Sequence, residues 1–233
     1  MRATLLLALF PVVASAQIVG PEHMDLALGV LRGAPGLTFV LKGTDQLPNR
    51  EQSFRVNFYY EPGTTTQGPR VALWSYRDGV LDRQLMADGT DLYRYDPVLK
   101  QYSVVGYGNL SGLKAMVQAT GRGNMARPIQ LWTDVLSADS WRQWIRRAEL
   151  DTSTPLELRY ENENDLLRLI FSSPFTPDSP RLAEMRGREE RGSLTTTWEM
   201  AITPSLPSNL QFAFVVPSGA KPVSAPASVR SPD

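Results

Sequence analysis

The feature that most constrains the fold of this chain is a two-residue alternation of side chains between residues 53 and 60. Apolar and aromatic residues at alternate positions are Phe54, Val56, Phe58 and Tyr60, and between them stand Ser53, Arg55, Asn57 and Tyr59. Because successive side chains of a β-strand point to opposite faces of a sheet, this period predicts a strand with one buried face. The same period at residues 37–41 and 194–202 predicts two further strands.

Turn signals separate these strands from others. The pairs Asp78-Gly79 and Asp88-Gly89 each stand between strand-like stretches, and Asp-Gly is a strong β-hairpin signal. Asp96-Pro97 supplies another turn. The expected strands of this meander span residues 70–76, 81–87, 91–95 and 101–105. We expect the connection DQLPNRE between the first two strands and a Gly/Thr/Pro-rich loop over residues 61–69.

Helical periodicity occurs before and after the meander. Residues 21–33 carry an apolar stripe that ends at Gly33, and its members are Met24, Ala27, Leu28 and Leu31. Three further helices are expected to begin near Asn109, Pro128 and Asp139, the last of them spanning residues 140–149. Strands are expected again at residues 156–160, 166–171, 181–188, 193–202 and 210–216. Residues 224–233 lack periodicity and are expected to be a disordered tail.

This order of elements predicts an α+β fold with one domain over residues 17–223. A helix precedes a run of strands, further helices follow, and a second run of strands closes the chain. Such an order fits one curved antiparallel sheet that forms an unclosed barrel, with the helices packed against its concave face.

The N-terminus has the pattern of a cleavable export signal over residues 1–16. Arg2 precedes an apolar run over residues 5–13, and small residues at Ala14 and Ala16 predict cleavage near Ala16-Gln17. The run is too short for a stable transmembrane anchor, and no cysteine follows it for lipid attachment. The alternative is a buried N-terminal helix. We expect a soluble periplasmic protein rather than an integral membrane protein.

Composition argues against most catalytic chemistry. The chain has no cysteine and one histidine, His23, for which a surface or capping role is expected. Lys plus Arg and Asp plus Glu are balanced at 24 each, so no nucleic-acid partner is indicated. The carboxylate pairs Glu161/Glu163 and Glu189/Glu190 lie in charged, turn-like stretches typical of solvated hairpin tips. We therefore predict no enzyme activity, no catalytic residue, no metal site and no cofactor.

The segment LMADGTDLYRYDPVLKQYSV, residues 85–104, resembles the bacterial outer-membrane lipoprotein carrier (LolA-like) family. RVALWSYRDG, ARPIQLW and LQFAFVVPSGAKPV are similar to further segments of that family in the same order. The sequence departs from the family at GTTTQGPR, where the order of the expected Arg-Pro is reversed, and at the charged GREERG hairpin. The resemblance implies an unclosed β-barrel with a helical lid over a hydrophobic cavity, and a role in carrying, chaperoning or sorting acylated lipoproteins.

The leading functional hypothesis is a periplasmic binding protein that shields a lipoprotein acyl chain or another lipid. An inner- or outer-membrane protein is a further candidate partner. The residues expected to line the cavity are Phe39, Phe54, Val56, Phe58, Tyr60, Tyr93, Tyr95, Met116, Trp132 and Leu136. The alternative is an envelope interaction or sensor module of the same fold, in which side chains fill the interior completely.

Overall fold

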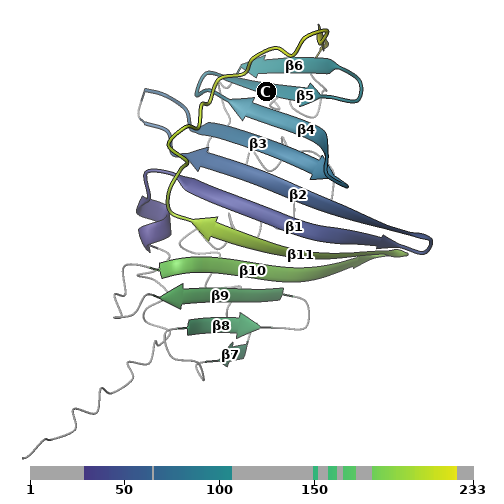
Figure 1. Ribbon diagram of the computed structural model, residues 1–233. Helices are drawn as coiled ribbons and strands as arrows, with labels where there is room; N and C mark the ends of the chain where they lie inside the picture. The colour runs from purple at the N-terminus through teal and green to yellow at the C-terminus, as the bar shows by residue number, and fades with distance from the viewer. Residues whose placement is uncertain are drawn as a thin grey trace, which may run out of the picture.

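The computed structural model describes residues 29–64, 66–106, 149–151, 157–161, 165–171 and 180–224, which contain one sheet of twelve strands (Figure 1). The strands are β1 (Leu37–Leu47), β2 (Arg50–Glu61), β3 (Arg70–Arg77), β4 (Val80–Ala87), β5 (Asp91–Asp96), β6 (Gln101–Gly106), β7 (Glu149–Asp151), β8 (Glu157–Glu161), β9 (Asp165–Phe171), β10 (Pro180–Arg191), β11 (Leu194–Thr203) and β12 (Lys221–Pro222). The expected export signal, the three middle helices and residues 225–233 lie outside the described residues.

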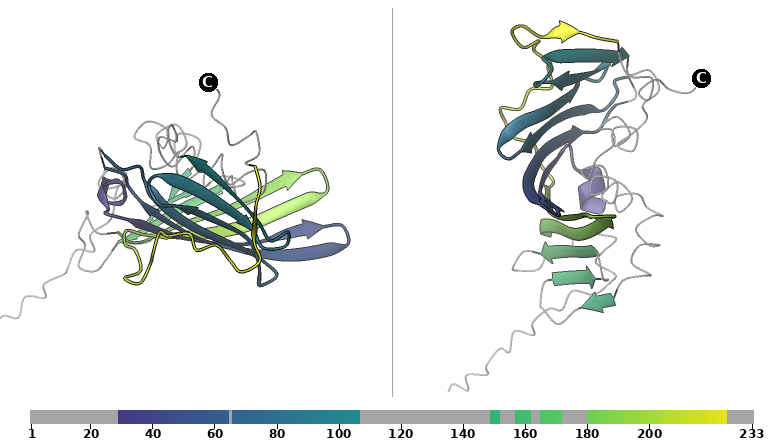
Figure 2. Two further views of the ribbon diagram at one scale, coloured as in Figure 1. Left: turned by 90° about the horizontal axis from the view of Figure 1, so that it is seen from above. Right: turned by 90° about the vertical axis from the view of Figure 1, so that its right-hand side faces the viewer.

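The sheet is open and predominantly antiparallel. Its order is β12-β6-β5-β4-β3-β2-β1-β11-β10-β9-β8-β7, and only β12 with β6 is a parallel pair. The predicted unclosed, curved antiparallel sheet is therefore confirmed. Figure 2 shows the curvature, with helical residues 29–33 on the concave side and residues 204–220 on the convex side. Whether further helices pack on the concave face concerns residues outside those described.

The predicted hairpins follow from the turn residues. Asp78 and Gly79 have φ values of 48° and 80°, and a two-residue type I′ turn needs positive φ at both central positions. The Asp88 carboxylate accepts hydrogen bonds from the backbone N–H groups of Thr90 and Asp91, each at 2.8 Å. The Asp96 carboxylate accepts one from Leu99 N at 2.9 Å, which closes the next turn. Aspartate therefore defines all three turns of the meander.

Three sequence predictions need correction. The connection between β1 and β2 is only Pro48-Asn49 rather than DQLPNRE, because cross-strand pairing continues to Leu47 opposite Arg50. Residues 210–216 are not a strand, since they cross the convex face of the sheet without joining its ladder. Glu149, predicted as the end of a helix, belongs to β7 and pairs with Glu161.

Candidate functional site

The concave face carries a continuous apolar strip that crosses five neighbouring strands. Phe39 lies opposite both Phe58 and Ile202, and Phe58 in turn lies opposite Leu73. The rings of Phe39 and Phe58 are 5.0 Å apart between centroids and tilted by 50°. We call this set of residues the concave strip: Phe39, Leu41, Val56, Phe58, Leu73, Leu85, Met200 and Ile202. Their exposed fractions range from 0 to 3%.

The concave face becomes polar toward the β1–β2 turn. Asp45 is 5% exposed and accepts a hydrogen bond from the Thr196 hydroxyl at 2.8 Å. Arg77 lies 3.5 Å from carboxylate oxygens of both Asp45 and Asp82, and its guanidinium donates to the Gln52 side chain at 3.0 Å. Because a buried carboxylate needs such partners, this cluster satisfies the charge of Asp45. The concave face is thus apolar along the strip and ionic at one end.

Two arginines also border the concave strip. Cross-strand pairing places Arg94 opposite Leu85 and Ser103, while Arg83 lies opposite Ser75 on the next strand pair. Burial, followed by the neighbouring charge of Arg83, lowers the pKa of the Arg94 guanidinium. The border of the strip therefore holds positive charge in a partly desolvated environment.

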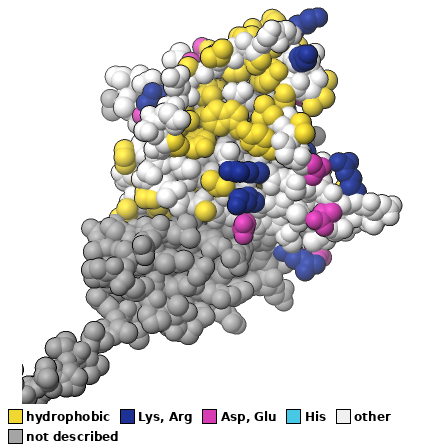
Figure 3. Space-filling view, viewed as in Figure 1, with side chains coloured by type: hydrophobic (Ala, Val, Ile, Leu, Met, Phe, Trp, Pro, Cys, Tyr) yellow, Lys and Arg dark blue, Asp and Glu magenta, His cyan; other side chains and the backbone are white. Residues whose placement is uncertain are grey.

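Residues 204–220, which we call the strap, cover part of the convex face. Phe212 of the strap packs on Ala72 and Met86, while Leu206, Leu210 and Phe214 pack around this core. Arg70 lies over the Phe212 ring with its guanidinium carbon 5.1 Å from the ring centroid. Figure 3 shows the resulting gathering of apolar side chains over the upper strands of the sheet.

Phe214 makes the densest aromatic contacts of the strap. Its ring stacks on Tyr93 at 5.0 Å with an interplanar angle of 17°, and it also meets Tyr102 at 5.7 Å and Tyr95 at 6.5 Å. Because these rings belong to β5 and β6, the strap fastens the C-terminal segment to strands distant in sequence. The strap therefore covers these tyrosine rings on the convex side of β5 and β6.

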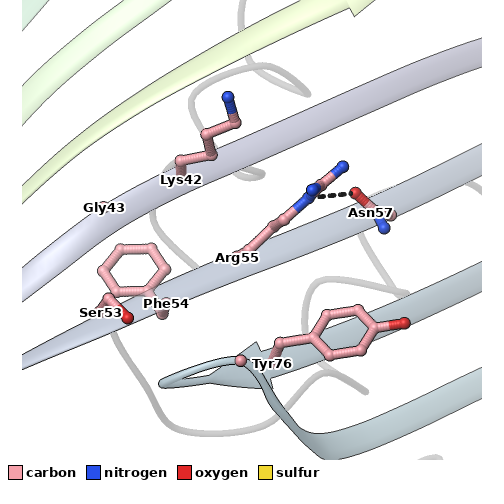
Figure 4. Close-up of a pocket in the computed structure, with 8 residues that line it drawn as sticks. Lys42, Gly43, Ser53, Phe54, Arg55, Asn57 and Tyr76 are labelled. Atoms are coloured by element: carbon pink, nitrogen blue, oxygen red, sulfur yellow. Dashed lines mark hydrogen bonds between the residues drawn. The ribbon is translucent and has the colours of Figure 1, made fainter.

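A depression opens on the convex face over β1, β2 and β3 (Figure 4). Its volume is about 600 Å³, and Lys42, Arg55, Asn57 and Tyr76 are among its lining residues. Lys42 lies opposite Arg55 on one side and Glu199 on the other, and Arg55 Nε donates to the Asn57 side chain at 3.1 Å. Both cations are exposed, so the depression is a polar surface feature without a buried charged group.

The structure divides the predicted site residues between the two faces. Phe39, Phe54, Val56 and Phe58 are buried on the concave face, and Tyr60 is half-buried there, where burial raises the pKa of its phenol. Tyr93 and Tyr95 lie instead on the convex face under the strap. The remaining three predicted residues, Met116, Trp132 and Leu136, lie outside the described residues.

The sequence prediction missed other residues of the concave face. Leu73 and Leu85 complete the strip, but Ala72 and Met86 beside them are buried on the opposite face, so alternation does not single out the concave residues of β3 and β4. The buried Asp45 had no sequence signal either, because its partners Arg77 and Thr196 are distant in sequence.

The described residues contain neither a cluster of metal-binding side chains nor a membrane-spanning helix. No group of three or more His, Cys, Asp or Glu side chains there is arranged to hold a metal ion. No helix within the described ranges has the length and apolar character needed to cross a membrane.

The chain matches no protein-family model and no curated protein sequence. Solved structures similar to it include LprF from Mycobacterium bovis, with 10% identity, 88% of this chain and 100% of that chain covered, and a TM-score of 0.38. A DUF1329 family protein from Desulfovibrio piger has 9% identity, coverage of 82% and 94%, and a TM-score of 0.34. A putative outer membrane lipoprotein-sorting protein domain from Vibrio parahaemolyticus has 9% identity, the same two coverages, and a TM-score of 0.31. These values assign the chain to no family.

Proposed function

We propose that this protein is a non-enzymatic carrier that holds the acyl chain of a lipoprotein or another lipid against the concave face of its sheet. The observation that carries the proposal is the concave strip, which runs unbroken across β11, β1, β2, β3 and β4. The strip is covered at 0 to 3% exposure, so a ligand would have to replace the groups that cover it. An elongated apolar ligand can do so because burying its methylene groups is favourable. The export signal expected at residues 1–16 would place this activity in the periplasm.

The energetics of such binding are favourable. An acyl chain of about fourteen methylenes would gain about 11 kcal/mol at about 0.8 kcal/mol per buried methylene. The loss of translational and rotational freedom on binding opposes this gain by at least about 4 kcal/mol. The remaining about 7 kcal/mol corresponds to a dissociation constant of about 10 μM. An affinity in this range suits a carrier that must also release its ligand.

The border of the concave strip supports an amphiphilic ligand rather than a purely apolar one. Arg83 and Arg94 lie beside the strip, and a carboxylate or phosphate there would restore hydrogen bonds to the partly desolvated guanidinium of Arg94. Arg94→Gln should therefore weaken the binding of a fatty acid about tenfold and leave the binding of the matching fatty alcohol nearly unchanged. Equal loss for both ligands would contradict this placement of the head group.

The adjacent tyrosines Tyr59 and Tyr60 allow a direct test, because they point to opposite faces of the same strand. A photoreactive phenylalanine analogue at position 60 should crosslink a radiolabelled fatty acid, and the same analogue at position 59 should not. Protein purified from an exporting host should also carry lipid detectable by native mass spectrometry. Absence of both copurified lipid and crosslinking at position 60 would overturn the proposal.

A second candidate function is an interaction module with a filled interior. Its supporting observation is that every residue of the concave strip is already covered, at 0 to 3% exposure. This candidate predicts that an apolar dye fails to bind, that position 60 crosslinks only to the protein itself, and that a protein partner is captured by an edge strand or loop. The crosslinking experiment therefore separates the two functions.

A further inference from the structure

Exposed apolar side chains are concentrated at one corner of the sheet. The described residues contain eight exposed large hydrophobic side chains, and two of these, Leu47 and Val80, stand at other turns. The remaining six belong to the β5–β6 turn, to β6, to the part of the strap that follows Phe214, and to the residue after β12: Val98, Leu99, Val104, Val215, Val216 and Val223. We call this set, with Lys100 and Lys221, the β6 corner. A soluble protein rarely gathers exposed apolar groups in this way unless the patch contacts something.

The β5–β6 turn begins with ordinary turn residues but continues with unusual ones. Turns of this kind favour Gly, Asn, Asp and Ser, but after Asp96-Pro97 the chain continues with Val98, Leu99 and Lys100. Val98 and Leu99 are 77% and 62% exposed, so neither is explained by burial. Lys100 has a φ of 52°, a left-handed conformation that costs a non-glycine residue free energy. The turn therefore presents two exposed apolar side chains, followed by a lysine at a position where glycine would be less strained.

Positive charge accompanies the apolar groups. The chain contains only four lysines, and two of them, Lys100 and Lys221, belong to this corner, where Lys221 N donates to Lys100 O at 2.9 Å. Both lysine side chains are exposed. The nearest carboxylate of the turn, Asp96, accepts a hydrogen bond from Leu99 N and so serves the turn itself. The corner thus combines exposed valine and leucine side chains with flanking ammonium groups.

We propose that the β6 corner docks the protein peripherally on an anionic lipid bilayer. The apolar side chains would enter the boundary between head groups and acyl chains, while Lys100 and Lys221 would contact lipid phosphates. A second copy of the chain fits less well, because a two-fold contact through this corner would gather four lysine ammonium groups, two from each copy, in one interface. This surface is separate from the concave strip, so the proposal does not depend on the function proposed above.

The test is flotation of the purified protein with vesicles of phosphatidylcholine alone or of phosphatidylcholine mixed with phosphatidylglycerol. Wild-type protein should float with the anionic vesicles, and added salt should weaken this binding because it screens the lysines. Lys100→Glu together with Lys221→Glu should reduce the partition coefficient at least about thirtyfold, which corresponds to about 1 kcal/mol for each removed cation. Val98→Asp together with Leu99→Asp should reduce it by at least as much.

Matched controls come from the same sheet. Val80 is 68% exposed but stands between Asp78 and Asp82, so Val80→Asp should leave vesicle binding unchanged. Lys42→Glu, compared with Lys100→Glu alone, controls for the change in net charge, because Lys42 is an exposed lysine outside the β6 corner. Equal losses in the control and corner variants would overturn the proposal, as would wild-type protein that does not float. A change of oligomeric state in the corner variants with unaltered flotation would assign the corner to contact between copies instead.

Discussion

Replacing Phe214 by alanine tests whether the strap is an energetic part of the fold. The phenyl ring is half-buried, so its removal should cost about half of the roughly 2.5 kcal/mol expected for full burial. The stacked contact with Tyr93 at 5.0 Å should add about 1 kcal/mol, and the two tilted contacts with Tyr95 and Tyr102 should add less than that together. We therefore expect Phe214→Ala to lower the free energy of unfolding by about 3 kcal/mol.

Urea unfolding followed by tryptophan fluorescence measures this loss, because Trp74 lies on the convex face among the residues packed by the strap. A thermal melt should show a fall of about 6–12 °C in Tm, since about 1 kcal/mol corresponds to about 2–4 °C in a chain of this size. Combining Phe214→Ala with Tyr93→Leu in a double-mutant cycle should give a coupling energy of about 1 kcal/mol. A loss below about 1 kcal/mol with no coupling would refute the reasoning and show that the strap covers the sheet without stabilising it.

Three further predictions concern single side chains. Hydrogen bonds from the backbone and hydroxyl of Ser53 hold the pKa of Asp78 below its ordinary value of 3.8, so wild-type stability should fall as the pH drops below about 4, and Asp78→Asn should lose this part of the pH dependence in acid urea titrations. Gly43→Ala should lower Tm, because its Cβ would overlap the backbone carbonyl oxygen of Thr197, and a wild-type Tm would refute that close approach. Asp45→Ala should destabilise by about 1–3 kcal/mol by unpairing buried groups, whereas the same loss in Asp45→Asn would show that the carboxylate charge itself is needed.

Much of the sheet could be predicted because its information is local. The alternation in β1, β2 and β11 is repeated over enough residues to define the buried face, and Asp78-Gly79 has the conformations that its hairpin requires. Strand ends were less accurate, since pairing near the β1–β2 turn is decided by the partner strand rather than by residue type.

The strap shows why side-chain periodicity alone did not predict the conformation of residues 210–216. Phe212 and Phe214 alternate with other residues as they would in a strand. Their backbone nevertheless pairs with no strand, and their rings pack onto the convex face of the sheet. An extended segment and a paired strand have the same side-chain period, so the sequence pattern cannot distinguish them. Tyr93 and Tyr95 were expected in the cavity for a different reason: alternation within β5 groups residues by face but does not tell which face is concave, and the strap covers these two on the convex face.

The two-residue strand β12 has a consequence for polymerisation of the folded protein. The N–H group of Lys221 within β12 donates to Lys100 O, and the N–H group of Val223 just after β12 donates to Tyr102 O. Pro222 between them has no N–H to offer to an incoming chain. Where β12 pairs with Gln101 and Tyr102, the sheet edge therefore gives another strand almost no template for addition, and this part of β6 is protected against edge-to-edge growth into fibres.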